Sequence, residues 1–159
     1  MKNLLILSLT SFLVIALLGV TKAQDLTPQQ KALIEKQVDA EFQKMVKAAE
    51  QLDYDMLAKG VDDRQQAGFI TNNIYYAQFD TLIKAYEASA QGILSQSISF
   101  GNKKITALSD RIVLITAAGR SVGTVNTGDT FTVKFFWSFV YEKIDDQWKV
   151  IQSHQSTGK

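Results

Sequence analysis

The chain has 159 residues, no cysteine, and 17 basic against 16 acidic side chains, which gives a formal net charge of +1. The absence of cysteine excludes disulfide bonds, thiolate chemistry and a lipoprotein anchor. A nearly neutral charge without a basic cluster argues against nucleic-acid binding. The length suits one domain of ordinary size with its own hydrophobic core.

The first 23 residues have the pattern of a secretory signal peptide. Lys2 precedes an apolar run over residues 4–18, and Thr21-Lys22-Ala23 places small residues where a signal peptidase cuts. The run is shorter than the roughly 20 residues of a membrane-spanning helix, which disfavours the alternative of an uncleaved anchor. We therefore expect cleavage before Gln24, no stable membrane insertion afterwards, and a secreted or periplasmic domain over residues 24–159.

A long helix is expected at the start of this domain. Thr27 fits its N-cap, Pro28 fits the first helical position, and Gln30 completes a capping box. Apolar residues then recur at helical spacing as far as about Gln51, which predicts one buried stripe. The stripe consists of Leu33, Ile34, Val38, Phe42, Met45, Val46 and Ala49.

Three shorter elements are predicted next. Asp53 is the expected cap of a second helix over residues 54–59. Residues 67–71 suit a short strand, which the turn signal Asn72-Asn73 closes. A third helix follows over residues 78–91, with its apolar residues on one side.

The rest of the chain has the pattern of β-strands. Residues 93–100 and 103–108 flank Gly101-Asn102, a pair typical of hairpin turns, so two strands are predicted there. Residues 111–122 form the next predicted strand. Helices first and a long antiparallel meander afterwards predict an α+β domain, with the helices packed on one face of a curved sheet.

The last hairpin is predicted around the acidic turn Asp145-Asp146. With these two residues as the loop, Ile144 faces Gln147, and Glu142 faces Lys149 with opposite charge. If the register continues without interruption, one face is aromatic and ends in three polar residues. Its facing pairs would be Tyr141 with Val150, Phe139 with Gln152, Trp137 with His154, and Phe135 with Ser156.

This order of elements resembles the SnoaL-like branch of the nuclear transport factor 2-like superfamily, whose fold is also called cystatin-like. The branch typically closes with a Trp-Lys-Ile/Val strand and a His-x-Ser, which match Trp148-Lys149-Val150 and His154-Gln155-Ser156. Residues 51–57 are similar to the start of its second helix. The resemblance covers residues 26–156 and implies a cone-shaped roll, in which a curved, mainly antiparallel sheet wraps around N-terminal helices and an apolar cavity. It also implies homodimers through the outer face of the sheet.

The aromatic face with its polar end is the candidate ligand site. The expected contacts are Trp137, Phe139, Gln152 and His154, together with Tyr76, which lies where the resemblance places the mouth of a cone. The alternative is that the aromatic residues only pack the core. The expected ligand is a small, mostly apolar molecule. No cofactor is expected, and no metal either, because one histidine without a suitably spaced pair of acids does not make a metal site.

Two other functions remain open. His154 could act as a general acid or base, because histidine titrates near neutral pH, which would make the protein an isomerase or lyase acting on a hydrophobic substrate. The isomerases, dehydratases and epoxide hydrolases of the superfamily use acidic residue sets, and none of these sets maps onto this sequence. The other function is a homodimeric interaction module, in which Ser138, Lys149 and Ser153 lie on the outer face.

Overall fold

The computed structural model describes residues 25–158, so the predicted signal peptide over residues 1–23 lies outside the described part. In chain order the elements are α1 (Pro28–Glu50), α2 (Tyr54–Lys59), β1 (Phe69–Thr71), β2 (Ile74–Tyr76), α3 (Phe79–Ser89), β3 (Ile93–Ala107), β4 (Ile112–Val125), β5 (Thr130–Ile144) and β6 (Gln147–Gly158). None of the described helices is long and apolar enough to cross a membrane.

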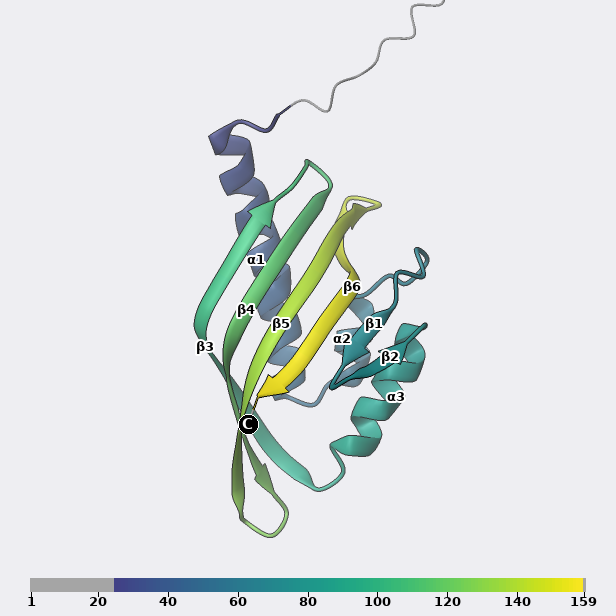
Figure 1. The fold of residues 1–159 in the computed structure, drawn as a ribbon, viewed down its shortest axis with the longest axis vertical. Coiled ribbons are helices and arrows are strands. Elements are labelled where there is room, and N and C mark those ends of the chain that lie inside the picture. The colour runs from purple at the N-terminus through teal and green to yellow at the C-terminus, as the bar shows by residue number, and fades with distance from the viewer. Residues whose placement is uncertain (1–24, 159) are drawn as a thin grey trace, which may run out of the picture.

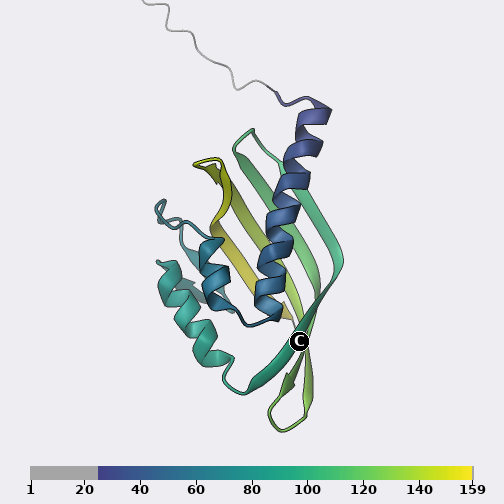
Figure 2. The same ribbon diagram turned by 180° about the vertical axis from the view of Figure 1, so that it is seen from behind.

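The six strands form one curved sheet in the order β2-β1-β6-β5-β4-β3. Neighbouring strands are antiparallel, except that β1 runs parallel to β6. All three helices lie against the same face of the sheet, with α1 running along it, α2 beside α1, and α3 beside α2 (Figures 1 and 2). The predicted fold class, an α+β roll of a mainly antiparallel sheet around N-terminal helices, is confirmed.

The helix α1 begins and ends as the sequence predicts. The Thr27 hydroxyl accepts a hydrogen bond from the Gln30 backbone N–H (3.2 Å), and the Gln30 side-chain oxygen accepts one from the Thr27 N–H (2.8 Å). This capping box satisfies two backbone donors that the first turn leaves unpaired. Val38, Phe42 and Val46 from the predicted stripe are buried against the sheet.

The two strands predicted around Gly101-Asn102 are one continuous strand, β3, so the predicted hairpin there is wrong. The register between β3 and β4 shifts between Phe100 and Asn102, which makes Gly101 the extra residue of a β-bulge. Glycine inside an extended run suits a bulge as well as a turn. The neighbouring strand β4 decides between them, because it is long enough to pair with both halves of β3.

The turn of the last hairpin is confirmed. Asp145 and Asp146 have φ angles of 49° and 60°, as both central residues of a type I′ turn require, and Ile144 faces Gln147. The predicted register also holds where Tyr141 faces Val150.

Beyond that pair the predicted register is wrong, because a β-bulge shifts it by one residue between Val140 and Tyr141. Ile151 is the extra residue on β6, so every later side chain of β6 exchanges its predicted face for the other. The observed pairs are Val140 with Gln152, Phe139 with Ser153, Ser138 with His154, Trp137 with Gln155, Phe136 with Ser156, and Phe135 with Thr157.

The bulge lies where β6 changes its neighbour on the side away from β5. Val150 donates its N–H to the Gly60 carbonyl and accepts a hydrogen bond from the Asp62 N–H, both at 2.9 Å. Further along, β6 pairs instead with β1, beginning at Phe69 opposite Ser153. Two separate segments therefore determine the two halves of β6, and the extra residue lies between them.

Gly119 provides a test of how closely β3, β4 and β5 pack. A Cβ atom at Gly119 would lie 2.7 Å from Cζ of Phe135 and would collide with the backbone oxygen of Ser99. We expect Gly119→Ala to lower the free energy of unfolding by about 2 kcal/mol or more, because the backbone of a central strand cannot move away. Gly101→Ala is the control, since its nearest atom would be 3.8 Å away. Equal urea midpoints for the two variants would contradict this packing.

Because the Tyr141 hydroxyl is buried, we expect the protein to lose stability at alkaline pH. Its side chain is 1% exposed, and its hydroxyl contacts the Met45 sulfur at 4.0 Å. Burial, and to a smaller extent the charge of Glu41, raises the pKa of Tyr141 far above its usual value. In the unfolded chain Tyr141 ionises near pH 10, while in the folded chain its hydroxyl keeps the proton. The contribution of the protonated hydroxyl to the free energy of unfolding is therefore fully present below about pH 10 and is lost as the pH rises further.

We therefore expect Tyr141→Phe to lose less stability than the unsubstituted protein when the pH rises from neutral to about 11. Tyr75→Phe is the control, because Tyr75 is exposed. The measurement is the urea unfolding free energy at each pH. Parallel pH profiles for Tyr141→Phe and the unsubstituted protein would contradict the assigned burial of this hydroxyl.

Candidate functional site

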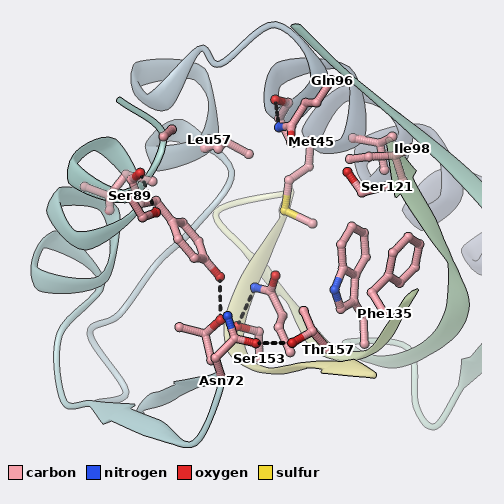
Figure 3. A pocket seen from close by; sticks show the side chains of 18 of the residues that line it. Met45, Leu57, Asn72, Ser89, Gln96, Ile98, Ser121, Phe135, Ser153 and Thr157 are labelled. Carbon is pink, nitrogen blue, oxygen red and sulfur yellow. Dashed lines mark hydrogen bonds between the residues drawn. The ribbon is translucent and has the colours of Figure 1, made fainter. Parts of the chain in front are cut away.

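A cavity of about 290 Å³ opens between the helix-covered face of the sheet and the three helices. Met45 and Leu57 from α1 and α2 lie on one side of it, and Phe135 from β5 lies on the other (Figure 3). Most of the lining is apolar, which is typical of a site for a small organic ligand.

The sheet side of the cavity is a wall of packed aromatic rings. Trp137 stacks on Phe135 with a centroid distance of 3.8 Å and an interplanar angle of 16°. Phe139 and Phe100 pack edge-to-face with Trp137, with ring-centroid distances of 6.0 Å and 6.1 Å. These contacts fix the orientation of the indole before any ligand arrives. Trp137 and Phe139, two of the predicted contacts, line the cavity; a ligand contact for them stays a prediction.

The other three predicted contacts do not line the cavity. Because of the bulge in β6, Gln152 and His154 point to the outer face of the sheet, and His154 is exposed there opposite Ser138. Their predicted position is therefore wrong. Tyr76 ends β2, a strand at one edge of the sheet, and packs against the core. Ser153, predicted on the outer face, is instead 1% exposed and lines the cavity.

In place of His154, a row of uncharged polar side chains enters the cavity from β6. Ser153, Gln155 and Thr157 line it, with the Gln155 amide nitrogen donating to the Ser153 hydroxyl oxygen (3.4 Å). Thr157 donates to the side-chain oxygen of Asn72 (3.1 Å), and the Tyr86 hydroxyl donates to that of Thr71 (3.2 Å). Figure 3 shows Asn72, Ser153 and Thr157 gathered on one side of the cavity.

Sequence reasoning missed this row because its members meet only through tertiary pairing. The parallel register places Thr71 of β1 beside Gln155 of β6, and the Asn72 N–H donates to the Gln155 carbonyl (3.0 Å). The alternation of β6 would have found Ser153, Gln155 and Thr157 if the bulge had been placed. No local signal identifies Asn72 as their neighbour.

Two tyrosines are the ionisable groups of the cavity lining. Burial raises the pKa of Tyr86, which the hydrogen bond to Thr71 partly offsets. Burial, followed by the negative charge of Glu87, raises the pKa of Tyr54. Both hydroxyls therefore stay protonated at neutral pH and are available only as uncharged hydrogen-bonding groups.

Among the described residues that line the cavity there is no Asp, Glu, His, Lys or Arg. Within residues 25–158, no three acidic or histidine side chains come together in a way that could hold a metal ion. A general acid or base that works at neutral pH needs a pKa near neutrality. The described lining can therefore bind and orient a molecule through apolar contacts and uncharged hydrogen-bonding groups.

No protein-family model matches the sequence, and no curated protein matches it significantly. Solved structures do match. A nuclear transport factor 2-like superfamily protein from Salmonella enterica superposes with a TM-score of 0.71 at 10% identity, covering 80% of this chain and 93% of its own. A candidate scytalone dehydratase from Novosphingobium aromaticivorans gives 0.74 at 12%, covering 84% and 89%.

A hexachlorocyclohexane dehydrochlorinase from Novosphingobium barchaimii gives a TM-score of 0.68 at 12% identity, covering 84% of this chain and 92% of its own. Identities this low make the similarity one of fold, and the same fold hosts unrelated chemistries. The chain has the fold of the nuclear transport factor 2-like superfamily, as the resemblance of its sequence implies.

Proposed function

We propose that the protein is an exported domain that binds a small, mostly apolar molecule in its cavity without catalysing a reaction on it. The observation that carries this proposal is the lining, which combines a rigid aromatic wall with neutral hydrogen-bonding groups and lacks a charged side chain among its described residues. Export rests on the signal-peptide pattern of residues 1–23.

The packing of the wall supports binding because it lowers the cost of ordering the site. Trp137 is already held between Phe135, Phe100 and Phe139, so a ligand does not have to immobilise it. An apolar molecule that leaves water for this cavity gains about 25 cal/mol for each Å² of apolar surface that it buries. A flat molecule gains most, since it can cover the indole.

The isomerase or lyase alternative loses its main support. It relied on His154 reaching the cavity, whereas His154 is exposed on the other face of the sheet. Tyr54 and Tyr86 remain as proton donors, but their raised pKa values make them weak acids at neutral pH. The names of the dehydratase and dehydrochlorinase neighbours describe those proteins, whose fold this chain shares without an acidic group in its cavity lining.

A second proposal concerns the outer face of the sheet, where we propose that two copies of the chain associate. The helices cover only the opposite face (Figures 1 and 2). Phe136 is 54% exposed on this outer face and Val122 is 40% exposed, so apolar area is available to a partner. Ser138 also lies there, opposite His154, whereas Ser153 does not.

Replacing the indole tests the cavity. N-phenylnaphthylamine is an uncharged apolar fluorophore that brightens when it leaves water, and its titration reports the affinity. We expect Trp137→Ala to weaken binding by about tenfold or more, because a large part of the wall is lost. Phe136→Ala is the matched control, since Phe136 directly precedes Trp137 on β5 and faces outward. Equal affinities for the two variants would contradict the assignment of the cavity.

A charge on the outer face tests the dimer. We expect the protein to be a dimer at high micromolar concentration by light scattering, and Phe136→Asp to be a monomer, because an unpaired carboxylate would be buried in the interface. Asn73→Asp is the control, because it adds the same charge at the exposed turn between β1 and β2. A monomeric unsubstituted protein, or a dimeric Phe136→Asp variant, would remove this proposal.

A further inference from the structure

Two acidic side chains beside the cavity are hydrogen-bonded to backbone N–H groups of lining residues. Glu50 accepts a hydrogen bond from the Ile98 N–H (2.7 Å), and Asp63 accepts one from the Phe79 N–H (3.0 Å), although both Ile98 and Phe79 line the cavity. The cavity therefore offers an ionised ligand no opposite charge among the described lining residues. A carboxylate or an ammonium group would lose its hydration without an ion pair in return.

The polar row, in contrast, has unused hydrogen-bonding capacity of both kinds. Asn72 uses its side-chain oxygen for Thr157, which leaves its amide N–H groups as donors. Gln155 uses its nitrogen for Ser153, which leaves its side-chain oxygen as an acceptor. Among the described residues neither of these remaining groups has another hydrogen-bond partner. Gln96, the other amide of the lining, already donates to the Ala49 carbonyl at the end of α1.

The aromatic wall and the polar row are directly adjacent. Trp137 on β5 faces Gln155 on β6, and side chains that face each other across an antiparallel pair have Cβ atoms about 5 Å apart. A flat ring that covers Trp137 therefore brings its substituent next to the Gln155 amide. Ser153 lies deep on the same strand face, while Asn72 and Thr157 are exposed, so the row runs from the floor of the cavity to its rim.

From these contacts we infer that the ligand is an electrically neutral, flat molecule with one uncharged polar substituent that both donates and accepts hydrogen bonds. A carboxamide has this chemistry, and a carboxylate of the same shape does not. The inference rests on the proposed ligand-binding function and adds a selection rule to it: the cavity discriminates against ionised ligands of equal size and apolar surface.

Naphthamide and naphthoate are the probes for this rule, because they share one bicyclic skeleton and differ in charge. Each is titrated against the full protein that carries N-phenylnaphthylamine, and loss of fluorescence reports displacement. We expect naphthamide to bind about tenfold or more tightly than naphthoate at neutral pH. Equal displacement by the two probes, or stronger displacement by naphthoate, would overturn the inference.

The same titration separates the inference from the function that it rests on. If N-phenylnaphthylamine binds and Trp137→Ala weakens it, but both probes displace it equally, the cavity binds ligands without the proposed selection. If N-phenylnaphthylamine does not bind, both the function and the inference fail.

A substitution at Gln155 should reverse the preference. Gln155→Lys places a positive charge in the polar row, so naphthoate should become the tighter ligand. Gln152→Lys is the matched control, because it adds the same charge to the same strand on the outer face and should leave the preference unchanged. A reversed ligand preference in Gln152→Lys would contradict the assigned position of the polar row. An unchanged preference in a folded Gln155→Lys variant would contradict it as well.

Gln155→Leu decides the matter if the lysine variant does not fold, because it removes the hydrogen-bonding group without adding a charge. We expect Gln155→Leu to weaken the binding of naphthamide by about fivefold, which is the effect of losing one hydrogen bond. The affinity for unsubstituted naphthalene should stay unchanged. A similar loss for naphthamide and naphthalene would show that Gln155 only shapes the cavity, and would overturn the inference.

Discussion

The chemistry of the cavity depends on one constraint, which is that β6 must pair with two different segments along the same edge. Gly60 and Asp62 hold the strand at Val150, and β1 holds it from Ser153 onward. The extra residue between these two attachments forms the bulge, and it turns the second half of the strand over. Uncharged polar side chains of β6 therefore line the cavity. His154, the one histidine of the chain, lies instead on the outer face of the sheet.

The bulge changes which side chains line the cavity and leaves the fold unchanged. The curved sheet and its helices are shared with solved structures whose names include a dehydratase and a dehydrochlorinase. In this chain the described residues of the cavity lining include no charged side chain, and burial keeps Tyr54 and Tyr86 protonated at neutral pH. One fold can host different chemistries, because a few side chains decide which groups reach a bound molecule.

Much of the fold could be predicted because its signals are local. The capping box of Thr27 and Gln30 indicates the start of α1. Asp145-Asp146 indicates a turn whose geometry does not depend on distant residues. The bulges are less accessible to sequence reasoning. Gly101 suits a bulge or a turn equally well, and the length of β4 decides. The one-residue shift at Ile151 depends on segments that lie far earlier in the chain, so an uninterrupted register placed the wrong side chains in the cavity.

The bulge can be tested most directly by the chemical accessibility of two adjacent residues. The chain contains no cysteine, so Ser153→Cys and His154→Cys each introduce a single thiol. A thiol reagent applied to the folded protein should label position 154 rapidly and leave position 153 protected, because Ser153 is 1% exposed and His154 is exposed. Rapid labelling at position 153 with protection at position 154 would mean that the register continues without a bulge and that His154 lies in the cavity.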